Sequence, residues 1–109
     1  MPAPTPRDVL FKTLADPTRR ALFERLCREG EATVGVLTAG AGVSQPAVSK
    51  HLAVLKQAGL VRDRPDGRQT HYSVPPGALD PLVDWTTQMA AFWAGRFDRL
   101  DDLLTRMDQ

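Results

Sequence analysis

The sequence predicts a mainly α-helical domain that carries one small β-hairpin. Apolar residues recur at helical spacing in five segments, and an Asp-Gly pair separates two short runs of strand-forming residues. A chain of 109 residues with 42% apolar content has room for one globular domain and is not wholly disordered. Residues 1–6 are rich in proline and predict a flexible leader, so the folded domain is expected over residues 7–109.

The first third of the chain is expected to hold two helices. A short helix fits residues 7–15. Its apolar side comprises Val9, Leu10, Phe11 and Leu14. A second helix is expected to begin at Asp16 and Pro17, because Asp is a good N-cap and Pro fits the first helical turn. Its buried stripe comprises Ala21, Leu22 and Leu26, with Phe23 beside them. Gly30 is expected to end this helix.

Two further helices are expected on either side of a glycine turn at residues 39–42. Thr33 can cap the first of them. Its apolar residues are Val34, Val36 and Leu37. Ser44 can cap the second, which is expected to run to about Ala58 and to end at Gly59. Val48, Leu52 and Leu55 follow helical spacing and predict its buried face.

The hairpin and a long last helix complete the chain. Residues 60–64 and 69–74 predict two strands, and the Asp66-Gly67 pair between them is a strong hairpin signal. Asp80 followed by Pro81 repeats the capping pattern and predicts a helix over about 80–107. Two consecutive helices joined by a tight turn and followed by a basic hairpin describe a winged helix-turn-helix.

The polar face of the helix after Ser44, together with the hairpin, predicts a surface that meets DNA. A recognition helix presents its N-terminal residues to base edges in the major groove. Gln45 suits adenine, Ser49 suits several bases and Ala47 suits a thymine methyl. Cations and polar groups that suit phosphates or a minor groove complete the set: Lys50, His51, Lys56, Arg62, Arg64, Arg68 and Gln69. For the helix taken by itself, an ordinary solvated face is the alternative.

The distribution of charge agrees with a DNA-facing surface. The formal net charge is only +1, yet residues 44–76 carry five Lys and Arg against two Asp. Residues 77–109 carry three Arg against six Asp. A basic middle and an acidic tail indicate one face that meets an anion and another that avoids it.

Four segments resemble the ArsR/SmtB family of bacterial repressors. They are LADPTRRAL at 14–22, SQPAVSKHL at 44–52, LKQAGLV at 55–61 and the Asp66-Gly67-Arg68 turn, and the resemblance extends over residues 7–107. It implies a homodimer, held mainly by the first and last helices, that represses transcription from a roughly palindromic operator. It also implies the following DNA contacts: Ser44, Gln45, Ser49, Lys50 and His51 on the recognition helix, and Arg64, Arg68 and Gln69 on the wing.

The last helix carries more aromatic and aliphatic residues than a small helical core needs. An obligate dimer interface accounts for the excess, because such interfaces resemble a core cut in half. The residues expected there are Val9, Leu10, Leu82, Trp85, Met89, Phe92, Trp93, Phe97, Leu100 and Leu104. A pocket for an unidentified small-molecule effector, lined by Trp85, Met89, Phe92 and Trp93, is the alternative.

The sequence predicts no metal site and no cofactor. Thr33 and Gly35 stand where one site of the resembled family has Cys-x-Cys, and the last helix has aspartates but no histidine. Cys27 is expected to be a small buried hydrophobe, because a redox sensor usually needs a second, resolving cysteine. A metal- or redox-responsive switch on the same scaffold is retained as an alternative.

Enzymatic and membrane functions are not expected. The chain has neither a Gly-x-Ser-x-Gly elbow nor a glycine-rich phosphate loop. Its apolar runs are too short to span a bilayer, and its N-terminus does not resemble a signal peptide, so a cytoplasmic protein is expected. The predicted function is sequence-specific binding of double-stranded DNA by a transcriptional regulator. A winged-helix module that binds protein is the competing class.

Overall fold

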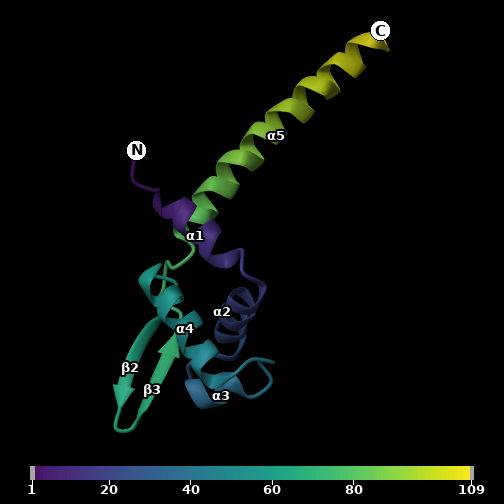
Figure 1. Cartoon of the computed structure of the whole chain (residues 1–109). Coiled ribbons are helices and arrows are strands. Elements are labelled where there is room, and N and C mark those ends of the chain that lie inside the picture. The colour runs from purple at the N-terminus through teal and green to yellow at the C-terminus, as the bar shows by residue number, and fades with distance from the viewer. Residues whose placement is uncertain (1, 109) are drawn as a thin grey trace. The chain divides into compact units, whose positions relative to one another are not determined.

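The computed structural model describes residues 2–108, which divide into two units with boundaries at Leu79 and Asp80. The order of elements confirms the winged helix-turn-helix that the sequence predicts (Figure 1). The first unit contains α1 (Pro6–Leu14), α2 (Pro17–Glu29), β1 (Ala32–Thr33), α3 (Val34–Thr38), α4 (Gln45–Gln57), β2 (Arg62–Asp66) and β3 (Gln69–Ser73). The second unit contains α5 (Asp80–Met107).

Side-chain caps set where the helices of the first unit begin. Each cap accepts a backbone N–H in the first turn that has no partner inside the helix. The caps are Asp16, which accepts from Arg19 N at 2.9 Å, Thr33, which accepts from Val36 N at 3.3 Å, and Ser44, which accepts from Ala47 N at 3.4 Å. These three confirm the predicted helix starts. Thr5 and Asp8 form a reciprocal capping box, so α1 already begins at Pro6, the last residue of the expected leader.

The end of α4 is fixed by a glycine. Gly59 has φ 79°, a left-handed conformation that a side chain disfavours. In this conformation Gly59 N donates to Lys56 O at 3.0 Å and Leu60 N donates to Leu55 O at 2.9 Å. These two bonds make a Schellman motif, which satisfies the last carbonyls of the helix and turns Leu60 into the core.

The core of the first unit lies between α1, α2, α3, α4 and the segment that leads from α4 into β2. Its apolar residues are Leu10, Leu22, Phe23, Leu26, Ala32, Leu37, Val48, Leu52, Leu55, Leu60 and Val61. Burying each leucine side chain contributes about 1.5–3 kcal/mol to folding. The predicted face of α4 is therefore confirmed. One residue of the stripe predicted to be buried on α2 is wrong, because Ala21 is exposed. Phe11 on the predicted apolar side of α1 is exposed as well, and on α3 only Leu37 is buried.

The sheet has three strands in the order β1-β3-β2, not the two that the hairpin predicts. β1 pairs antiparallel with β3, with Ala32 opposite Tyr72 and Thr33 opposite His71. β2 runs over Arg62–Asp66, two residues later than predicted. Leu60 belongs to the Schellman motif that ends α4, and both Leu60 and Val61 are buried in the core before the strand begins. The sheet thus joins the start of the helix-turn-helix directly to the hairpin.

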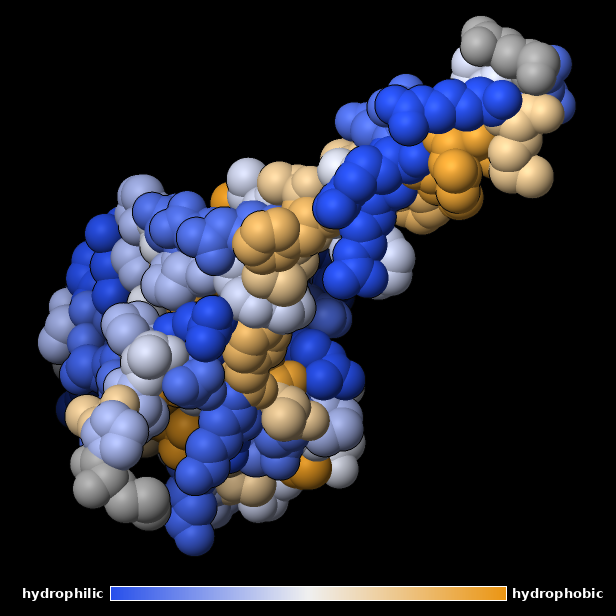
Figure 2. Space-filling view, turned by 90° about the horizontal axis from the view of Figure 1, so that it is seen from above, coloured by the Kyte–Doolittle hydropathy of each residue, from blue (hydrophilic) through white to orange (hydrophobic). Residues whose placement is uncertain are grey.

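The helix α5 runs for 28 residues with no break. It begins at Asp80, so Asp80 lies in its first turn and not at the expected cap position. None of its described residues is buried. Figure 2 shows apolar side chains gathered on one side of this helix and hydrophilic ones on the other. Its exposed large apolar residues are Val83, Phe92, Trp93, Phe97, Leu100, Leu103, Leu104 and Met107.

Candidate nucleic-acid interface

The start of α4 presents the polar residues that the sequence singles out. Gln45, Ser49 and Lys50 are exposed, whereas Val48 and Leu52 on the opposite face are fully buried. The hydroxyl of Ser44 is engaged in the cap, so its oxygen already accepts Ala47 N–H. The α4 N-terminus therefore offers a mixed set of hydrogen-bonding and cationic groups on a rigid helix, as base readout requires.

The hairpin places one arginine at its tip. Asp66 pairs with Gln69, so the two central residues of the turn are Gly67 and Arg68, and Asp66 belongs to β2. Gly67 has φ 62°, and no residue other than glycine has a positive φ among those described. A positive φ at the first central position alone is the requirement of a type II′ turn, which suits the twist of a hairpin. Arg68 is exposed there.

A groove of about 350 Å³ brings the helix and the hairpin tip together. Its lining comes from the starts of α3 and α4, the hairpin turn and β3: Thr33, Val34, Gly35, Gln45, Arg68, Gln69, Thr70 and Tyr72. Three of the predicted DNA contacts, Gln45, Arg68 and Gln69, thus share one surface. The sequence-based set omits Thr33, Thr70 and Tyr72. The pairing of Ala32 with Tyr72 and of Thr33 with His71, which joins β1 to the hairpin, carries no local sequence signal.

The remaining predicted cations fall into two classes. Lys50, Arg62 and Arg68 have no ion-pair partner within residues 2–108. Lys56 and Arg64, in contrast, are paired: Lys56 Nζ lies 3.0 Å from Asp63 Oδ2, and Arg64 Nε donates to Glu31 Oε2 at 3.3 Å. A second Arg64 nitrogen donates to the other Glu31 oxygen.

The Arg64–Glu31 pair perturbs the titration of both partners. The hydrogen bond from Arg64 lowers the pKa of Glu31, and the same bond raises the pKa of Arg64. His71 lies beside this pair, with Nδ1 3.5 Å from Glu31 Oε1 and Nε2 3.5 Å from Asp66 Oδ2. The side chains of Arg64 and His71 therefore both lie next to the carboxylates of Glu31 and Asp66.

Two other predicted contacts have neighbours inside the protein. Arg62 Nε donates to Ser73 Oγ at 3.4 Å across the hairpin. His51 is half-buried on α4 near the Asp16 cap of α2, where its charge adds to the effects that lower the pKa of Asp16. The largest of those effects is the backbone hydrogen bond from Arg19. Ala47 is also half-buried.

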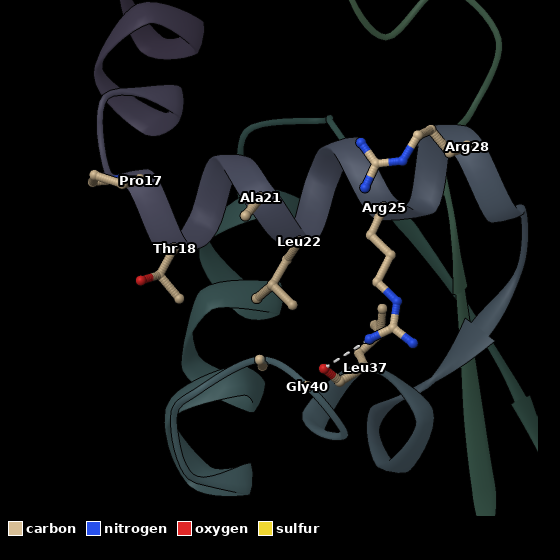
Figure 3. Close-up of a pocket in the computed structure, with 9 residues that line it drawn as sticks. Pro17, Thr18, Ala21, Leu22, Arg25, Arg28, Leu37 and Gly40 are labelled. Carbon is tan, nitrogen blue, oxygen red and sulfur yellow. Dashed lines mark hydrogen bonds between the residues drawn. The ribbon is translucent and has the colours of Figure 1, made fainter.

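A second cavity, of about 370 Å³, lies between α2 and the turn that joins α3 to α4. Figure 3 shows Thr18, Leu22 and Arg25 pointing from α2 toward that turn. Arg25 spans the gap, because its terminal nitrogen donates to Leu37 O at 3.3 Å and Ala39 O at 2.9 Å. Its Nε donates to Glu29 at 2.8 Å. Arg25 therefore ties the turn of the helix-turn-helix to the body of the protein.

Among residues 2–108, no group of three or more His, Cys, Asp and Glu side chains is placed to hold a metal ion. Cys27 is exposed and not buried as expected. Desolvation raises the pKa of its thiol, so the reactive thiolate is disfavoured. None of the helices in this part of the chain combines the length and hydropathy needed to cross a membrane.

Comparisons with known proteins agree with the helix-turn-helix geometry. Residues 14–64 match the family model described as a helix-turn-helix domain. The chain is 46% identical over 86 residues to the HTH-type transcriptional regulator Rv2034 of Mycobacterium tuberculosis, covering 79% of this chain and 77% of the relative. It is 34% identical over 76 residues to the transcriptional repressor SdpR of Bacillus subtilis, covering 70% and 83%.

A solved structure extends the comparison to the fold. The crystal structure of an ArsR family transcriptional regulator superposes with a TM-score of 0.75 at 30% identity. The match covers 85% of this chain and 95% of that one. The likeness therefore includes nearly the whole of the solved protein.

Proposed function

Because the chain belongs to the ArsR family of winged helix-turn-helix transcriptional regulators, we propose that it binds a palindromic operator as a homodimer and represses transcription from it. We also propose that it acts in the cytoplasm and has no enzymatic activity. The observation that carries the proposal is the groove that Gln45 shares with Arg68, because it joins a base-reading group to an unpaired cation.

The DNA contacts follow from the exposed groups around this groove. The N-terminal part of α4 enters the major groove, where Gln45 and Ser49 read base edges. Lys50 and Arg68 hold phosphates, because within residues 2–108 neither has a carboxylate partner to give up. Thr70 and Tyr72, which line the same groove, supply further hydroxyl groups to the sugar-phosphate backbone.

The homodimer is supported by the composition of α5. Its apolar residues recur every three or four positions over 28 residues, a helix about 42 Å long. The rings of Trp93 and Phe97 are tilted by 33° with centroids 6.0 Å apart, and both side chains are exposed, so they form part of a ridge of exposed apolar side chains along α5. Exposed apolar surface of this extent marks an interaction site. Leu10, included in the interface expected from the sequence, is only 3% exposed and belongs to the core.

The experiment that tests the proposal is a binding titration on the DNA immediately upstream of the gene for this chain. Fluorescence anisotropy at moderate salt should give tight binding that an excess of unrelated duplex does not displace. A winged-helix module that binds protein predicts no such binding. Equal affinity for the upstream and unrelated duplexes would contradict the proposal.

A further inference from the structure

Two ion pairs hold the wing, defined here as β2, β3 and their turn, to the rest of the first unit. Asp63 and Arg64 are consecutive on β2, so their side chains emerge on opposite faces of the sheet. On one face, Asp63 Oδ2 lies 3.0 Å from Lys56 Nζ in the last turn of α4. On the other face, Arg64 binds both carboxylate oxygens of Glu31, just before β1.

The surroundings of Arg64 make it a poor phosphate contact. Glu31 occupies two of its donors, and Asp66 Oδ2 lies 4.0 Å from a third nitrogen. His71, opposite Arg64 on β3, lies 3.5 Å from each of these two carboxylates. A phosphate that approached Arg64 would therefore meet two carboxylates and would have to displace a two-pronged hydrogen bond.

Lys56 has a corresponding position on the other face. It belongs to the recognition helix, yet its ammonium group binds a residue of the wing. The pair therefore links the two elements that are proposed to contact DNA. Breaking it would leave the hydrogen bonds of the hairpin in place and would loosen only its attachment to α4.

We infer that Lys56–Asp63 and Glu31–Arg64 form a two-sided clasp that fixes the wing relative to the recognition helix. Lys56 and Arg64 are positioning residues in this account, and Arg68 is the arginine of the wing that meets phosphate. The inference rests on the proposed function. Both pairs are partly solvent-exposed, and exposed ion pairs contribute little to global stability, so variants of the clasp should fold.

The salt dependence of operator affinity separates positioning from phosphate contact. Arg68→Gln should make the slope of log K against log salt shallower by about 1.8, twice the ~0.9 expected for each phosphate contact, since a dimer loses two. Arg64→Gln should weaken binding roughly three- to tenfold with an unchanged slope. Arg7→Gln is the matched control, because it removes one positive charge and breaks an exposed Arg7–Asp8 pair on α1, away from the wing and α4, and should leave affinity unchanged.

Charge reversal provides the second arm. Glu31→Arg and Arg64→Glu should each weaken binding, and the double variant should recover most of the affinity because the pair is rebuilt with its charges exchanged. Lys56→Glu with Asp63→Lys repeats the test on the other face, and thermal unfolding of each variant verifies its fold. An Arg64→Gln slope as shallow as that of Arg68→Gln, or double variants no better than the single ones, would overturn the inference.

The outcomes also separate this inference from the function on which it rests. A wild-type chain that fails to bind the upstream DNA would overturn the proposed function and the clasp together. A wild-type chain that binds, with charge-exchanged variants that do not recover, would overturn the clasp alone.

Discussion

Gln45, the first residue of α4, and Arg68, at the tip of the hairpin, line one groove although they belong to different elements. Three structural features produce this relationship. The Ser44 cap fixes where α4 begins, the positive φ of Gly67 sets the hairpin turn, and the pairing of β1 with β3 joins the hairpin to the start of α3. The proposed binding of DNA by the helix and the hairpin together depends on this shared groove.

Removing the guanidinium at the hairpin tip should weaken binding to all DNA sequences alike. Arg68→Ala loses a phosphate contact that carries no sequence information, so affinity for operator and for unrelated duplex should fall by similar factors. Titrations of both duplexes at several salt concentrations measure the change. A loss confined to the operator would assign Arg68 to base reading.

Removing the amide at the start of α4 should have the opposite pattern. Gln45→Ala should cost about 1–3 kcal/mol of discrimination at one base pair of each half-site while leaving binding to unrelated duplex unchanged. A panel of operators with single base-pair changes measures it. An unaltered preference at every position would exclude Gln45 from base readout.

An acidic residue on the apolar side of α5 should prevent dimerisation. Trp93→Glu removes the ring that lies against Phe97 and puts a carboxylate on the apolar side of α5, where burying a charge in a dimer interface is costly. Sedimentation should show a monomer at concentrations where the wild type is a dimer. Gln88→Glu, an exposed polar position on the same helix, is the control and should remain dimeric. A dimeric Trp93→Glu protein would place the interface elsewhere.

The glycine that ends α4 should be needed for its conformation and not for space. An added Cβ at Gly59 meets no atom within 4 Å, so Gly59→Ala should cost about 1–2 kcal/mol through its positive φ alone. A loss of about 1 kcal/mol lowers Tm by roughly 4–8 °C in a domain of this size.

Gly35→Ala provides the comparison. Gly35 is helical without a positive φ, and a Cβ added to it would lie 3.9 Å from its nearest neighbour, Thr33 Oγ1. This substitution should therefore be neutral or stabilising. Equal effects of the two substitutions on thermal unfolding would show that the Schellman geometry is unimportant.

Stability should decrease in acid partly through the Asp16 cap. Its pKa is lowered, chiefly by the backbone hydrogen bond from Arg19, so its contribution is present above the pKa of the unfolded carboxyl. That contribution is lost as pH falls through the lowered folded-state pKa. Asp16→Asn keeps a capping acceptor but gains no proton, so its unfolding midpoint in urea should vary less with acid pH. An identical pH dependence in both proteins would contradict this role.

The features that the sequence predicts correctly depend on near neighbours. The caps at Asp16, Thr33 and Ser44 are each set by a hydrogen bond within three residues, and the buried face of α4 follows the spacing of its own apolar residues; the structure confirms both. The strand β1 has only two residues, too few for any periodicity, and exists because β3 pairs with it. The sequence does not predict β1 because its partners, His71 and Tyr72, lie far from it along the chain.

The same distinction applies to the candidate site. The polar face of the predicted helix and the predicted hairpin turn identify Gln45 and Arg68 as candidate DNA contacts from the sequence, and both line the groove. The charge of Arg64 is neutralised by Glu31, which lies 33 residues earlier in the chain. No local sequence pattern connects these two residues. The residue types are sufficient to predict a basic hairpin, but they do not show that Arg64 is held in an ion pair.

A hydroxyl-radical footprint of the wild-type protein on the DNA upstream of its own gene is the sharpest test of operator binding by a dimer. We expect two protected segments related by twofold symmetry, with centres about one helical turn, roughly 34–36 Å, apart. The same footprint with Arg68→Ala should fade at lower salt than the wild type. The absence of protection at moderate salt, or protection without a twofold relationship, would contradict the account.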